Sequence, residues 1–313
     1  MSSEFVLMER ERVGWNFDID EKKVMDIPPS KGRYYELPRL NSDYWSIKEC
    51  RGYWPDTRGG SSDRAIRLLQ ANQEYHLLDS QYKILWSYMN PIIFHFTGRP
   101  VIWARNRYCS IGSNNKQEIL YLLSLLNSKL TKTILRMQLR NEYEKDLLIS
   151  ISSIKEYVRV PTISTQNKPI KNKIMERTEQ MLALEEKMLS DFVDFSGVLM
   201  QKFDDVQVAG NTLVLVHDNR ETKLPIQGDT GLIASTIARE FGARKLKLET
   251  CETSLSELRN LPVIDLEKQA KLKDYIDDLV FALYFKIPLK EIGLDKAKQI
   301  HEACSSSKYY QLL

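Results

Sequence analysis

Apolar side chains recur at helical spacing in residues 118–130, whose sequence is EILYLLSLLNSKL. Positions three and four residues apart fall on one face of a helix, so this segment is predicted to be a helix with one side in a core. The polar residues Asn127, Ser128 and Lys129 interrupt the apolar run, and the apolar face is expected to continue towards Met137. That face comprises Ile119, Leu122, Leu123, Leu126, Leu130 and Ile134.

Residues 171–201 have a second helical pattern and are predicted to form one long helix. Ile174, Met181, Met188 and Phe195 lie seven residues apart, which is typical of a helix packed against another helix. A further helix is expected within residues 64–86.

Short strands and a small C-terminal α/β module are predicted for much of the remaining chain. Residues 92–96 and 100–103 are candidate strands among Gly, Pro, Asn and Asp. Residues 212–216 and 222–226 are predicted to pair as a β-hairpin, with the second strand at a sheet edge because it contains Pro225. Two helices are expected to follow, with the predicted N-caps Asp229 or Thr230 and Asp265, an end of the first at Gly242, and Leu272, Ile276, Leu279, Val280 and Leu283 as the buried face of the second, residues 266–285.

These patterns predict an α/β (α+β) protein in three parts. Residues 1–117 are expected to be an irregular, basic and aromatic-rich recognition region with long loops. Residues 118–201 are expected to be a helical core with the long helix. Residues 202–313 are expected to be the small C-terminal α/β module.

Composition limits the class of protein. A chain of 313 residues with 42% hydrophobic and 28% charged residues has the composition of a globular protein. Neither a signal peptide nor a membrane span of ~18 apolar residues is present, so we expect a cytoplasmic protein. The four cysteines and four histidines are scattered without metal-ligand spacing, which favours reduced thiols and predicts no metal site.

Positive charge and aromatic residues are concentrated in the first half of the chain. Residues 28–140 hold 17 Lys and Arg against 8 Asp and Glu, whereas residues 161–313 hold 21 against 23. All five tryptophans lie in the first third. Arginines among aromatic residues are typical of a surface that neutralises phosphates and reads base edges, although a core of aromatics coated with arginines has the same composition.

Two segments resemble a known family. LLSLLNSKL, at residues 122–130, resembles the most recognisable block of the target-recognition regions of adenine-N6 DNA methyltransferases. These are the TaqI-like specificity domains that follow the catalytic domain in type IIG restriction–modification enzymes. YIDDLVFALYF, at residues 275–285, is similar to the helix that closes such chains. The resemblance spans about residues 90–290 and implies sequence-specific DNA recognition.

The sequence lacks the motifs that methylation requires. An amino-methyltransferase needs a glycine-containing loop for S-adenosylmethionine and an (N/D)PP(Y/F) loop for the flipped adenine. Asn90-Pro91 is followed by two isoleucines, so it is not that loop. Glu221-Thr222-Lys223, with Asp204 and Asp205 upstream, has the local spacing of a metal nuclease, a triplet that occurs by chance in most chains of this length.

We therefore expect a non-catalytic DNA specificity chain. The methyltransferase domain or subunit that carries S-adenosylmethionine is expected to be its partner, together with double-stranded DNA. Two alternatives remain: a catalytically active restriction nuclease or methyltransferase fragment, and a protein-interaction subunit of a phage-defence complex. The predicted DNA-contacting residues are Arg51, Tyr53, Trp54, Arg58, Arg64, Arg99, Arg105, Asn106 and Arg107 in loops, and Lys129, Lys132 and Arg136 on the exposed side of the LLNSKL helix, where they act on phosphates or on the partner.

Overall fold

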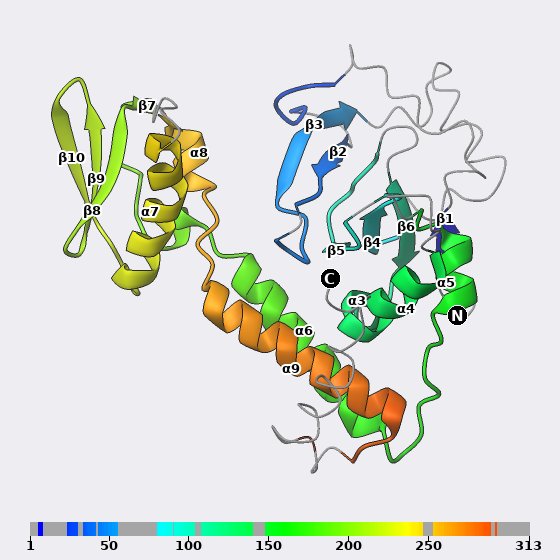
Figure 1. The fold of residues 1–313 in the computed structure, drawn as a ribbon. Coiled ribbons are helices and arrows are strands. Elements are labelled where there is room, and N and C mark those ends of the chain that lie inside the picture. Colours follow the sequence, from blue (N-terminus) through cyan, green and yellow to red (C-terminus); the bar gives the residue numbers. More distant parts are fainter. Residues whose placement is uncertain are drawn as a thin grey trace. The chain divides into compact units, whose positions relative to one another are not determined.

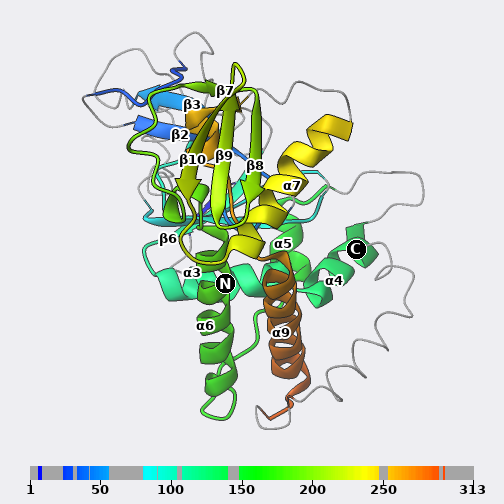
Figure 2. The same cartoon turned by 90° about the vertical axis from the view of Figure 1, so that its left-hand side faces the viewer.

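The computed structural model describes residues 6–8, 24–30, 34–41, 43–55, 80–89, 91–103, 108–139, 148–246, 253–288 and 292. The mixed α/β class is confirmed, with seven α-helices and several small antiparallel sheets among the described residues. The chain forms two compact units, whose elements Figure 1 and Figure 2 show from two sides. The first unit is Met1–Gln180 with Leu272–Leu313, and the second is Met181–Lys271.

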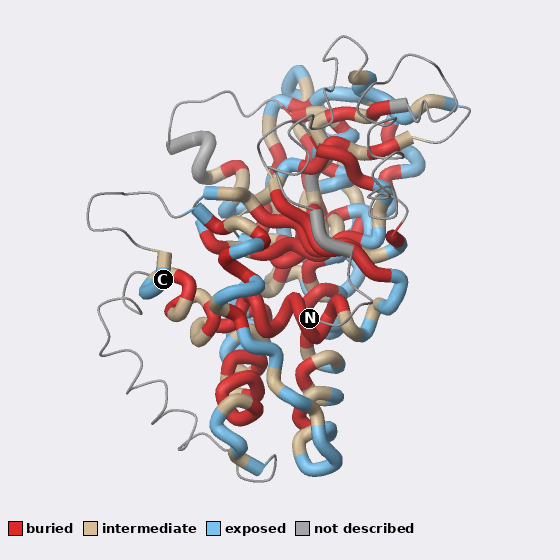
Figure 3. The backbone as a smooth tube through the Cα atoms, turned by 90° about the vertical axis from the view of Figure 1, so that its right-hand side faces the viewer, coloured by how far each residue is buried: buried red, intermediate tan, exposed pale blue. Residues whose placement is uncertain are grey.

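The first unit contains a four-stranded antiparallel sheet with the strand order β1-β6-β4-β5. Its strands are β1 (Val6–Met8), β4 (Tyr82–Ser87), β5 (Phe94–Thr97) and β6 (Tyr108–Ser113). Helix α3 (Lys116–Asn127) contacts β4, β5 and β6, and most residues of these three strands are buried (Figure 3). The helix expected within residues 64–86 does not include residues 83–86, which pair on both sides within the sheet, and residues 64–79 lie outside the described residues.

A second, two-stranded sheet pairs β2 (Tyr34–Arg39) with β3 (Glu49–Pro55). We call this pair the β2–β3 ribbon. Side chains on alternate sides of a strand point to opposite faces, so one face of the ribbon packs inward. That face belongs to a buried cluster of Tyr35, Leu37, Ile47, Trp54, Leu85, Val101, Ile102 and Trp103.

The first unit's helices are shorter than their patterns predicted. The apolar stripe of residues 118–137 is split into α3 and α4 (Lys129–Leu139), with an extended Ser128 between them. Helix α5 (Ile151–Tyr157) follows. Helix α6 (Lys168–Glu185) ends well before residue 201, because Met188 and Phe195 belong to non-helical segments. Phe195 is buried in the second unit's core, so seven-residue spacing here did not mean one helix.

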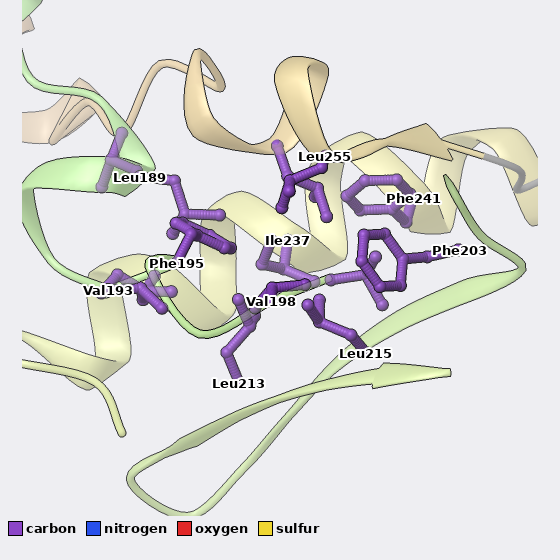
Figure 4. Close-up of a cluster of buried hydrophobic side chains, with 14 residues drawn as sticks. Leu189, Val193, Phe195, Val198, Phe203, Leu213, Leu215, Ile237, Phe241 and Leu255 are labelled. Carbon is purple, nitrogen blue, oxygen red and sulfur yellow. The ribbon is translucent and has the colours of Figure 1, made fainter. Parts of the chain in front are cut away.

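The second unit contains the predicted β-hairpin and the helix expected after it. Strands β8 (Asp205–Ala209), β9 (Thr212–His217) and β10 (Arg220–Pro225) form an antiparallel sheet with β10 at an edge, as Pro225 predicted. Asp218 and Asn219 have positive φ angles of 48° and 60°, which suits the tight turn between β9 and β10. Figure 4 shows Leu213 and Leu215 of β9 facing Ile237 and Phe241.

Of the two ends predicted for the second unit's long helix, the N-cap is confirmed and the C-terminal end is not. Helix α7 (Thr230–Leu246) begins after Asp229, whose carboxylate accepts a 3.0 Å bond from the N–H of Leu232. It runs past Gly242, so that predicted end is wrong. Short segments η2 (Leu189–Asp191), β7 (Lys202–Phe203), β11 (Thr253–Ser254) and α8 (Leu255–Arg259) complete the unit.

Helix α9 (Leu266–Phe285) leads from the second unit back to the first. Asp265 caps it as predicted, accepting a 2.9 Å bond from the N–H of Lys268. The predicted face is buried at Ile276, Leu279, Val280 and Leu283, whereas Leu272 is half-buried. The three predicted parts differ from the two units because the chain leaves the first unit within α6 and returns within α9.

Candidate functional site

The outer face of the β2–β3 ribbon carries two of the predicted DNA-contacting residues. Arg51 and Tyr53 lie on β3 and are half-buried. The Tyr53 ring meets the Tyr34 ring edge to face, with centroids 5.4 Å apart. Partial burial raises the pKa of Tyr53, with smaller contributions from Cys50 and Glu36, so its hydroxyl stays protonated and is able to donate a hydrogen bond.

Arg99 lies in the non-strand segment after β5, as predicted, and its side chain bonds to the ribbon. Its guanidinium forms a 2.8 Å ion pair with Glu36 of β2 and donates a 2.5 Å bond to the carbonyl of Ile47. Burial raises the pKa of Glu36, and the positive charge of Arg99 partly opposes that shift. Arg99 therefore joins β2 to the segment before β3, and a mutation at this position tests stability as well as binding.

Trp54 is a core residue rather than a DNA contact. It is 2% exposed and belongs to the buried cluster beneath the ribbon. The predicted contacts Arg58, Arg64, Arg105, Asn106 and Arg107 lie outside the described residues.

The polar insert of the LLNSKL segment has structural partners. Asn127 is buried, and its side-chain oxygen accepts a 3.1 Å bond from the N–H of Phe94 while its NH₂ donates a 2.7 Å bond to the Phe94 carbonyl. The amide thus forms two hydrogen bonds with β5, as a neighbouring strand would. Ser128 caps the next helix: its hydroxyl accepts from the N–H of Thr131 at 3.2 Å and donates to the carbonyl of Leu125 at 2.7 Å.

Lys129 joins the two segments that carry the family resemblance. Its backbone N–H donates a 2.9 Å bond to Asp277 of α9, 148 positions later in the chain. Its ammonium group lies 2.8 Å from the Asp274 carboxylate and 3.8 Å from that of Asp277. Asp277 of YIDDL and Asp274, one position before that motif, therefore meet the start of the helix that follows LLN.

Lys129, Lys132 and Arg136 are half-buried, so their predicted place on an exposed side is wrong. Burial lowers the pKa of Lys132 to about 8, against the attraction of Asp277. Burial also raises the pKa of Asp277 to about 7 and that of Asp278 to about 6. Lysines and carboxylates thus share a desolvated contact between α4 and α9, and this environment favours a structural role for the lysines.

His95 is the notable residue that the sequence pattern did not single out. It lies on β5 between Phe94 and Phe96 and is 3% exposed. Burial lowers the pKa of its imidazole to about 4, so the ring is neutral at pH 7. In the sequence, the position of His95 between two aromatic residues of a strand was the signal that could have identified it. The structure adds that both faces of this strand are buried.

The nuclease-like triplet lies on the outer face of the second unit's sheet. Lys223 pairs with Glu221 at 3.1 Å, and both side chains are largely exposed. Asp205 and Glu221 both pair with Val216 and are therefore separated by a whole strand. Among the described residues, Asp204, His217 and Asp218 are the group whose side chains lie close enough together to hold a metal ion. Neither Glu221 nor Lys223 belongs to this group.

No family model matches this chain, and no curated protein sequence matches it. None of the described helices is both long enough and apolar enough to cross a membrane.

Proposed function

We propose that this chain is the DNA target-recognition part of an adenine-specific methylation or restriction system. By this proposal a methyltransferase domain or subunit binds S-adenosylmethionine and transfers the methyl group. This chain binds the duplex and recognises the target sequence.

The contact between Lys129 and Asp277 carries the proposal. The two segments similar to the specificity domains are far apart in the sequence, yet the backbone N–H of one bonds directly to a carboxylate of the other at 2.9 Å. The contact brings both segments to one place in the fold. Their contact supports the interpretation that they are parts of one structural feature shared with that class of domain.

Charge supports the first unit as the DNA-binding part. Met1–Gln180 with Leu272–Leu313 holds 34 Lys and Arg against 27 Asp and Glu, whereas Met181–Lys271 holds 11 against 15. Phosphate contacts supply most of the sequence-independent affinity for DNA. The outer face of the β2–β3 ribbon adds Arg51 and Tyr53, and side chains of these two types bond to phosphates and base edges in protein–DNA complexes.

Replacing Arg51 tests the proposal against a matched control. Arg51→Ala is expected to weaken binding to the preferred duplex by roughly 1–3 kcal/mol if the guanidinium reads a base. Arg220→Ala removes the same charge from an exposed position of the second unit and is expected to leave binding unchanged. Fluorescence anisotropy, with duplexes first selected from a randomised library, measures both variants.

The outcomes separate the three classes of function. Equal affinities of Arg51→Ala, Arg220→Ala and the unchanged chain would remove the ribbon from the interface. A chain that binds no duplex, alone or with a methyltransferase partner, would favour a protein-interaction subunit. Magnesium-dependent cleavage that Glu221→Gln abolishes would identify a nuclease.

A further inference from the structure

Three side chains that commonly bind metal ions gather in the second unit where strand β9 turns into β10 (Figure 1). Asp204 lies immediately before β8, His217 is the last residue of β9, and Asp218 begins the turn. One ligand atom of each side chain lies within 4.8 Å of those of the other two. This group is separate from the ribbon that we propose to bind DNA, because the ribbon belongs to the first unit.

The backbone of the sheet brings these residues together. The last residue pair of β8 and β9 before this point is Asp205 with Val216. Asp204 and His217 are the next positions along the two strands, and side chains at facing positions lie on one face. The N–H of Asp204 donates to the carbonyl of Val216, and the N–H of Asp218 donates to the carboxylate of Asp204, each at 2.8 Å. The strands therefore hold the three residues in place before any ligand binds.

The distances within the group are longer than hydrogen bonds. Nδ1 of His217 lies 3.7 Å from the Asp204 carboxylate, and Nε2 lies 3.5 Å from the Asp218 carboxylate. Nδ1 has no hydrogen-bond partner among the described residues. Hydrogen bonds span ~2.7–3.2 Å, whereas ligand bonds of ~2.0–2.2 Å put neighbouring ligands of a tetrahedral zinc ion ~3.3–3.6 Å apart. The spacing thus fits ligands around an ion better than a hydrogen-bonded cluster.

The chemistry of the three side chains suits a zinc-like ion. Imidazole nitrogen and carboxylate oxygen are both zinc ligands, and three protein ligands leave the fourth position to water. The side chains of Asp204 and Asp218 are 56% and 84% exposed, so an ion reaches them from solvent. Exposed acidic residues are common without an ion, and the imidazole between the two carboxylates distinguishes this group.

We propose that Asp204, His217 and Asp218 bind one divalent metal ion that takes nitrogen and oxygen ligands, such as zinc, with water in the remaining position. The ion joins the start of β8 to the β9–β10 turn. It therefore stabilises the folded second unit relative to the unfolded chain, which lacks the site. Asp204 precedes His217 by 13 positions, so the spacing of histidines and cysteines in the sequence did not indicate it.

Calorimetric titration of the 313-residue chain with zinc chloride tests the proposal. One ion is expected to bind at this group. Asp204→Asn and Asp218→Asn each remove a charged ligand, and asparagine suits the φ angle of 48° at position 218, so the turn is retained. Each variant is expected to bind zinc at least about tenfold more weakly. Glu221→Gln is the control, because it removes a carboxylate from the same hairpin outside the group, and it should leave the affinity unchanged.

Cobalt locates the ion in the unaltered chain, whatever the substitutions do to the fold. Paramagnetic Co²⁺ broadens the NMR signals of nearby nuclei, so the amide signals of Asp204, Val216 and Asp218 are expected to broaden first. This broadening, with zinc affinity that the two asparagine variants lower and Glu221→Gln keeps, would support the site. Absence of zinc binding, equal affinity in all variants, or broadening only elsewhere would overturn it, and none of these outcomes bears on DNA recognition by the first unit.

Discussion

Asn127 links helix α3 to strand β5 through two hydrogen bonds with the backbone of Phe94. Asn127→Ala would leave a buried N–H and a buried carbonyl without partners, so we expect a loss of roughly 2–4 kcal/mol in the free energy of unfolding. The exposed Asn114 accepts a single bond from Gln81, so Asn114→Ala is expected to lose less than ~1 kcal/mol. Urea unfolding of both variants measures the difference, and equal losses would refute the structural role of Asn127.

The buried carboxyl of Asp277 is expected to make the free energy of unfolding depend on pH. Burial raises the folded-state pKa to about 7, well above the ~3.9 of an unfolded aspartate. The folded chain therefore holds a proton that the unfolded chain releases, and this contribution to stability is lost as pH rises from about 4 to about 7. Asp277→Asn keeps an acceptor for the Lys129 N–H but lacks the titration.

The stability of Asp277→Asn relative to the unchanged chain is thus expected to increase over that window, by up to ~1.4 kcal/mol per pH unit. His95 titrates in both proteins, so its effect cancels in the difference. Asp274→Asn is the control, because the exposed Asp274 pairs with the same lysine. Denaturant unfolding at a series of pH values measures both variants. Parallel pH profiles for Asp277→Asn and the unchanged chain would contradict the assignment of a desolvated carboxylate.

The break between α3 and α4 depends on the Ser128 side chain. Its hydroxyl accepts the Thr131 N–H and donates to the Leu125 carbonyl, which satisfies groups that helix ends leave free. Ser128→Ala is expected to lower the free energy of unfolding by ~1–2 kcal/mol. Ser235→Ala, which removes an exposed hydroxyl within α7, should cost less than ~0.5 kcal/mol. Identical unfolding midpoints for Ser128→Ala and the unchanged chain would show that the cap is not needed.

The sequence predicted those elements whose signals are local. The hairpin of β9 and β10, the caps Asp229 and Asp265 and most of the buried face of α9 are confirmed because each depends on residues a few positions apart. The split at Ser128 was missed because it depends on Asn127 reaching β5, 33 positions earlier. Non-local contacts of this kind leave no periodicity to detect.

The candidate site was predicted less well than the fold. Arg51 and Tyr53 lie on a partly exposed ribbon face, but Trp54, next in sequence, points into the core because strand side chains alternate. The sequence predicts an exposed basic flank at Lys129 and Lys132, because nothing local indicates that the carboxylates of helix α9 lie against them. The buried imidazole of His95 depends on pairing of β5 with β4 and with residues 45–47.

Over the whole chain, the excess of positive charge lies in the first unit, and the second unit is acidic. DNA binding through the first unit neutralises phosphates and releases counterions, so its affinity must depend on salt. A specificity chain that contacts about five phosphates has an expected slope of log K against log salt of about −4 to −5. A protein-interaction subunit has no such requirement.

The salt dependence of duplex binding by the 313-residue chain therefore tests the central claim most directly. Anisotropy titrations at increasing salt, with and without excess randomised duplex as competitor, measure both affinity and preference. The DNA-recognition proposal predicts a slope of about −4 to −5 and a preferred sequence that survives competition. A flat salt profile, or equal competition by every duplex, would contradict it.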